Sequence, residues 1–123
     1  PWKTDPRALD EHMRLWKTRE WQSWLSQRVS CPFPAIIAWP APRGPQLAQV
    51  GALLSSTPEK AYEFGIYFDV ADRNEWVAVG ATAVTPVDVT SPAFAALREY
   101  QAYRQRVGKP PGMRGRPDYF RLP

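Results

Sequence analysis

The chain has 123 residues, 44% of them hydrophobic and 13% aromatic, and its formal net charge is +4. This length suits one domain with a single hydrophobic core, and the composition excludes a mainly disordered chain. No apolar run approaches the roughly 20 residues that a membrane-spanning helix needs, and no signal-peptide pattern is present. The sequence therefore predicts a cytoplasmic protein that has no membrane partner.

The first predicted element is one long helix over residues 6–29. The Asp-Pro pair at residues 5–6 offers an N-cap followed by proline at the first helical position. Met13, Trp16 and Trp24 then share one face at the helical period. We expect this aromatic face to be buried against the rest of the domain.

Short strands separated by turns rich in proline, glycine and polar residues are predicted next. Phe64, Ile66 and Phe68 alternate with polar or differently facing residues, as on a half-buried strand. Gly51 lies where a bulge is expected. The predicted strands are residues 33–39, 46–54, 62–70, 75–79 and 82–87.

A second helix is predicted from residue 92 to about residue 107. Ser91 followed by proline repeats the capping device of residues 5–6, and Gly108 favours a helix end. Five short antiparallel strands between two helices predict an α+β domain, namely a small SH3-like antiparallel β-barrel with an N-terminal and a C-terminal helix. We expect this single domain to occupy residues 1–108.

Residues 109–123 are predicted to form an extended basic tail. Residues 98–123 hold seven basic side chains against two acidic ones, a balance of +5, so residues 1–97 come to −1. Such groups neutralise phosphates, and Tyr119 and Phe120 are available to stack on bases, so nucleic acid is one predicted partner class. A solubilising or protein-binding end is the alternative interpretation. The basic residues in question are Arg104, Arg106, Lys109, Arg114 and Arg116.

The motifs that mark common enzymes are absent from the sequence. There is no phosphate-binding loop, no dinucleotide-binding glycine motif and no serine nucleophile elbow. The single histidine, His12, and the single cysteine, Cys31, lie far apart in the sequence. The sequence therefore predicts a non-enzymatic binding module, with a small carboxylate-based enzyme as the third alternative.

Carboxylates in or beside the strand region are candidate ligands for a hard cation, which prefers several converging oxygen atoms. The alternative interpretation, which we favour, is that these carboxylates are solvated residues of turns and strand edges. The candidate ligands are Asp69, Asp72, Glu75 and Asp88.

Aromatic residues of the strand region predict a protein or peptide partner. We expect an exposed aromatic surface, since such groups are common where partners bind. The candidate residues are Trp39, Tyr62, Tyr67 and Trp76.

Several short motifs, read in order, carry a resemblance to a known family. They are Trp21-x-x-Trp24-Leu25, Phe33-Pro34-Ala35, Gln49–Leu53, Trp76–Val79, Val84-x-Pro86-Val87-Asp88, and a closing helix with Tyr100 and Tyr103. This order resembles the small prokaryotic calcium-binding protein family first known from cyanobacteria.

The resemblance implies an SH3-like barrel and calcium as the cofactor. Members of that family are strongly acidic, whereas this chain is basic, and only Asp88 corresponds to a family position by motif. The expected function is thus a binding module with a weak calcium site or a peptide surface. A nucleic-acid accessory protein that uses the basic tail is the alternative.

Overall fold

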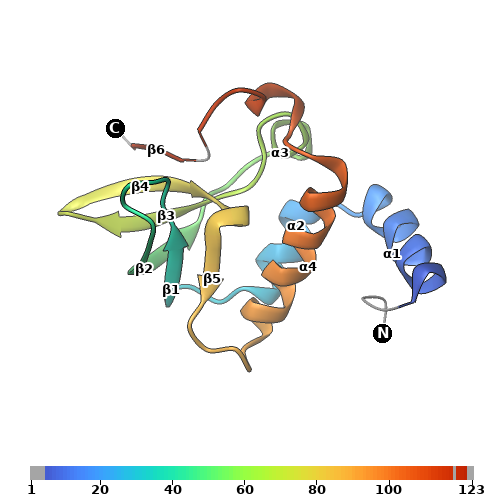
Figure 1. Ribbon diagram of the computed structural model, residues 1–123, viewed down its shortest axis with the longest axis horizontal. Helices are drawn as coiled ribbons and strands as arrows, with labels where there is room; N and C mark the ends of the chain where they lie inside the picture. Colours follow the sequence, from blue (N-terminus) through green and yellow to red (C-terminus); the bar gives the residue numbers. More distant parts are fainter. Residues whose placement is uncertain (1–4, 118, 122–123) are drawn as a thin grey trace.

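The computed structural model describes residues 5–117 and 119–121 and has a mixed α+β fold (Figure 1). The helices are α1 (Pro6–Thr18), α2 (Trp21–Arg28), α3 (Pro58–Phe64) and α4 (Pro92–Val107), with short 3₁₀ turns η1 (Ala81–Ala83) and η2 (Pro111–Met113). The strands are β1 (Phe33–Ala38), β2 (Pro45–Leu53), β3 (Tyr67–Asp72), β4 (Glu75–Gly80), β5 (Val84–Pro86) and β6 (Tyr119–Arg121). No helix among the described residues is long and apolar enough to cross a bilayer.

The strands form one antiparallel sheet in the order β5-β1-β2-β3-β4-β6. The predicted α+β class is therefore confirmed. In the described part of the chain β5 and β6 are the two outer strands and do not pair with each other, so hydrogen bonds do not close the sheet into a barrel.

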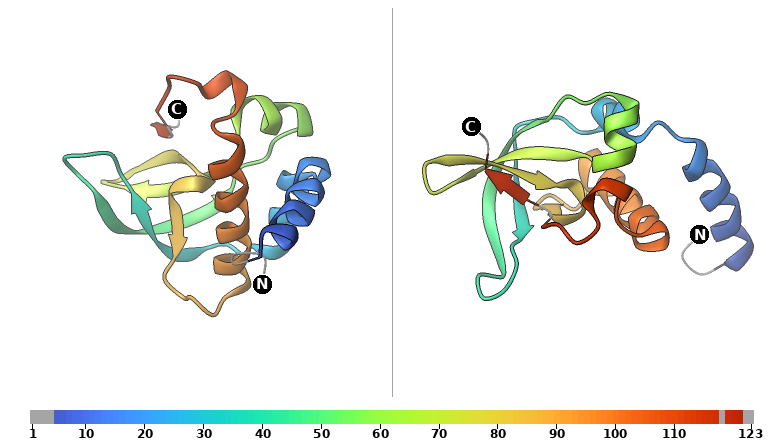
Figure 2. Two further views of the ribbon diagram at one scale, coloured as in Figure 1. Left: turned by 45° about the vertical axis from the view of Figure 1, so that its right-hand side comes forward. Right: turned by 90° about the horizontal axis from the view of Figure 1, so that it is seen from above.

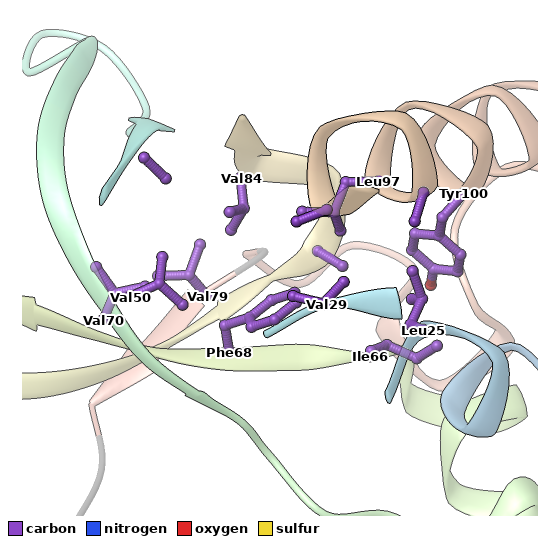
Figure 3. Close-up of a cluster of buried hydrophobic side chains, with 14 of the residues drawn as sticks. Leu25, Val29, Val50, Ile66, Phe68, Val70, Val79, Val84, Leu97 and Tyr100 are labelled. Atoms are coloured by element: carbon purple, nitrogen blue, oxygen red, sulfur yellow. The ribbon is translucent and has the colours of Figure 1, made fainter. Parts of the chain in front are cut away.

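The helices α2 and α4 lie between the sheet and α1 (Figures 1 and 2). The core forms where the inner face of the sheet meets α2 and α4. Phe68 and Val84 from the strands gather with Leu25, Leu97 and Tyr100 from the helices (Figure 3). Each of these five side chains is at most 2% exposed. Burial of such a side chain stabilises the fold by roughly 1.5–3 kcal/mol.

The predicted single helix over residues 6–29 is wrong, because two non-helical residues, Arg19 and Glu20, divide it into α1 and α2. Both residues adopt extended backbone angles. The Glu20 carboxylate accepts a hydrogen bond from the Ser23 backbone N–H at 2.5 Å and so caps α2. Arg19 forms an ion pair with Glu99 of α4 at 2.9 Å. Local capping and this distant ion pair together favour two short helices over one long one.

The predicted strand over residues 62–70 is also wrong at its start, because residues 62–64 belong to α3. Thr57 caps this helix by accepting the Lys60 backbone N–H at 3.2 Å, and proline occupies its first turn. Gly65 ends it with a φ of +89°, a conformation that favours glycine. The alternation continues only from Ile66 onward, and Phe64 stays 47% exposed.

Other predicted elements agree closely with the structure. The pairing of β2 with β3 shifts register at Gly51, where a bulge was expected. Arg73 and Asn74 both have positive φ at the tip of the β3–β4 hairpin. Gly108 ends α4 with a φ of +81°. The strand predicted over residues 82–87 is shorter in the structure, where it is β5, because η1 occupies the residues before Val84.

The segment after α4, predicted as an extended tail, packs back onto the domain at several residues. Met113 in η2 is buried, and β6 pairs with the outer edge of β4. The Tyr119 ring packs edge-on against Trp39 at a centroid distance of 5.6 Å. We call residues 109–117 and 119–121 the C-terminal segment. Contacts of η2 place the first part of this segment beside α3 (Figure 2).

Candidate binding site

A mostly apolar cavity lies between α3 and the C-terminal segment and has a volume of about 530 Å³. We call it the α3 cavity. Its apolar lining is Leu54, Phe64, Tyr67, Met113, Pro117 and Tyr119. Its polar lining is Ser55, Ser56, Lys60 and Arg116, together with the backbone of Gly65.

Helix α3 supplies two of these side chains from one face. Lys60 and Phe64 are four residues apart and therefore lie one above the other on the helix. Ala61 is buried and turns the adjacent face toward the core. A second, shallower hollow on α3 is also lined by Lys60 and Phe64, so the two hollows adjoin.

The opposite wall is held in place by contacts within the C-terminal segment. The Lys109 ammonium donates a hydrogen bond to the Arg116 carbonyl at 2.8 Å, and the Arg116 N–H donates to the Met113 carbonyl at 3.0 Å. Gly112 allows close contact with α3: a Cβ there would lie 2.7 Å from the Phe64 ring and 2.9 Å from the Glu63 carbonyl. This wall is therefore ordered by specific contacts.

The predicted aromatic residues do not form one surface. Tyr67 lines the α3 cavity, and Tyr62 is 68% exposed on α3. Trp76 is 49% exposed, and its indole lies against Gly51, where a Cβ would approach within 2.8 Å of the ring. Trp39 was expected to be exposed but is only 6% exposed, because Tyr119 covers it.

Arg43, in the β1–β2 loop, connects Trp39 to the β3–β4 hairpin. The Arg43 guanidinium stacks on the Trp39 ring at 4.3 Å and forms a bidentate ion pair with the buried Asp72. The Asp72 carboxylate raises the pKa of Arg43. The indole Nε1 of Trp39 is buried without a hydrogen-bond partner among the described residues. A smaller cavity of about 290 Å³ is lined by Trp39, Lys109 and Tyr119, among others.

The predicted basic residues are dispersed. Arg104 donates hydrogen bonds to the Tyr100 hydroxyl and to the Gly108 carbonyl, and its guanidinium lies over the Tyr103 ring at 5.1 Å. Burial raises the pKa of Tyr100. Arg106 and Arg114 are exposed, and Arg116 alone of the five lines the α3 cavity.

The predicted metal ligands have separate local roles. The Asp69 carboxylate accepts the Ala52 N–H at the bulge of β2, and Asp72 binds Arg43. Glu75 is exposed opposite Asp72. Asp88 follows β5, across the sheet from these three, and hydrogen bonds from Thr90 lower its pKa. Within residues 5–117 and 119–121, no three His, Cys, Asp or Glu side chains are grouped as a metal site needs.

Phe64, Met113 and Lys60 were missed as candidate binding residues. A signal for α3 was present, since Thr57-Pro58 is the same capping device as Ser91-Pro92. No local signal marks Met113, because its partners on α3 are about 50 residues away in the chain.

Comparison of the chain with family models, with curated proteins and with solved structures found no match. The resemblance to the prokaryotic calcium-binding family therefore stays a prediction.

Proposed function

We propose that this protein is a non-enzymatic peptide-binding module whose binding site is the α3 cavity. The observation that carries the proposal is the cavity itself. Its volume of about 530 Å³ lies in the range of known ligand sites, and most of its lining side chains are apolar or aromatic. A soluble domain gains stability by covering such groups, so their exposure favours a binding role.

An extended partner suits this site better than a compact one. The adjoining hollow on α3 continues the apolar surface past Phe64 toward Tyr62, which is 68% exposed. One apolar side chain of a peptide fits the cavity, and peptide residues further from this side chain would lie along α3. We further propose that the curved sheet corresponds to an SH3-like barrel. The Trp39–Tyr119 contact supports this proposal, because it joins the end of β1 to the last strand.

Selection from a random peptide library displayed on phage tests this function. Enriched peptides would be synthesised and their affinity measured by fluorescence anisotropy. Phe64→Ala should weaken binding by about fivefold or more, since truncation of a central aromatic contact costs on the order of 1 kcal/mol. Leu15→Ala on α1 is the control, because Leu15 is 53% exposed and lines neither hollow on α3.

Trp76→Ala tests the alternative that the partner binds the outer face of the sheet. Binding that depends on Trp76 and not on Phe64 would show that the partner uses the sheet instead. Near-ultraviolet circular dichroism of each variant would verify that the fold is kept.

A further inference from the structure

We propose that the α3 cavity selects a peptide in which acidic residues flank an apolar anchor. This inference rests on the peptide-binding function proposed above and adds the chemistry by which the partner is recognised. Its basis is the charge at the rim of the cavity.

Two cations from different parts of the chain meet at this rim. Lys60 comes from α3, and Arg116 follows η2; both are exposed and both line the cavity. In the part of the chain that the structure describes, neither side chain forms an ion pair, whereas Arg19 and Arg43 do. Among the described residues, the rim therefore presents two cations with no carboxylate bound to them.

The described residues that line the cavity add no opposing charge, because none of them is Asp or Glu. An apolar wall also lowers the local dielectric constant, which strengthens the attraction between a cation and a carboxylate beside it. Charge complementarity at this rim thus favours a partner that carries an apolar side chain with a carboxylate next to it.

A polyanion such as single-stranded nucleic acid fits less well. Glu59 and Glu63 flank Lys60 along α3 and line the adjoining hollow. A phosphate chain that continued from the cavity along α3 would meet these two carboxylates, whereas the acidic residues next to the anchor of a short peptide would stay at the rim beside Lys60 and Arg116. The positive potential is therefore local, which matches one or two carboxylates better than a run of phosphates.

Three blocked hexapeptides would test the inference by fluorescence anisotropy on the full chain. Each has a central leucine–phenylalanine pair, flanked on both sides by two glutamates, two glutamines or two lysines. The glutamate peptide should bind about 3- to 10-fold more tightly than the glutamine peptide, since two exposed ion pairs each add a fraction of a kcal/mol. The lysine peptide should bind most weakly, and salt should reduce the differences.

Matched double variants separate the rim from the overall charge. Lys60→Gln with Arg116→Gln should abolish the preference for glutamate. Arg98→Gln with Arg106→Gln removes the same charge from exposed positions on α4 and should keep the preference. Equal loss in both double variants would overturn the inference, because net charge alone would then explain the preference.

Three further outcomes also contradict the inference. Equal affinity for the glutamate and glutamine peptides would overturn the inference but leave the peptide-binding function standing. Failure of all three peptides to bind would contradict both the inference and the peptide-binding function. An oligothymidylate that binds wild type, competes with the glutamate peptide and fails to bind the Lys60/Arg116 variant would assign the site to nucleic acid.

Discussion

Trp16 and Glu99 lie 83 positions apart in the sequence and are joined by a hydrogen bond of 2.7 Å from the indole Nε1 to Oε1. The same carboxylate oxygen accepts the Arg19 guanidinium at 2.9 Å. Trp16 is fully buried and also packs edge-on against Tyr103 of α4. One carboxylate on α4 therefore positions both α1 and the break between α1 and α2.

Glu99→Ala should destabilise the domain by about 1–3 kcal/mol, because it leaves the buried indole N–H without that acceptor. Urea unfolding followed by tryptophan fluorescence measures the change in the free energy of unfolding. Glu99→Gln should cost less, since its amide oxygen can still accept the indole N–H. Equal stability of the alanine variant and wild type would show that α1 is not anchored through Glu99.

Gly112→Ala should displace the C-terminal segment from α3. A Cβ at this position would meet the Phe64 ring and the Glu63 carbonyl, both under 3 Å away. Overpacking of this kind typically costs about 1–3 kcal/mol. Thermal unfolding is the measurement, and Arg114→Ala, an exposed neighbour, is the control. An unchanged Tm for Gly112→Ala would contradict the close contact between η2 and α3.

Millimolar calcium should leave the Tm unchanged relative to sodium chloride of equal ionic strength. A cation that binds only the folded state would raise the Tm by mass action. Asp69 and Asp72, however, are already engaged with the Ala52 N–H and with Arg43. A calcium-specific rise that disappears in Asp88→Asn would instead support the function implied by the family resemblance.

Cys31 should react slowly with iodoacetamide at neutral pH. Burial raises the pKa of its thiol, so less thiolate is present in the folded chain than in the unfolded one at the same pH. The rate should rise with pH and reach half its plateau at a higher pH in the folded protein than in the urea-unfolded protein. Folded and urea-unfolded protein reacting at equal rates near pH 7 would contradict the effect of burial.

Elements with strong local signals were predictable from the sequence. The Ser91-Pro92 cap and Gly108 mark both ends of α4, and the hairpin residues Arg73 and Asn74 mark the turn between β3 and β4. These signals act within a few residues, so they can be recognised without knowledge of the fold.

Features set by distant contacts were not predictable in the same way. The break after α1 has no glycine or proline and depends on Arg19 meeting Glu99. Trp39 is buried because Tyr119 returns to cover it. The walls of the α3 cavity come from residues 54–67 and from residues 113–117 and 119, and no periodicity in the sequence joins these segments. The candidate site is therefore a product of the tertiary fold.

The measurement that tests the central claim most directly is a ¹H–¹⁵N NMR titration of the full chain with the glutamate-flanked hexapeptide. The largest chemical-shift changes should fall on the amides of Lys60, Phe64, Tyr67, Met113 and Tyr119, whose side chains line the α3 cavity. Changes that instead centre on Trp76 and Leu47, which are exposed on β4 and β2, would contradict the assignment of the binding site to the α3 cavity.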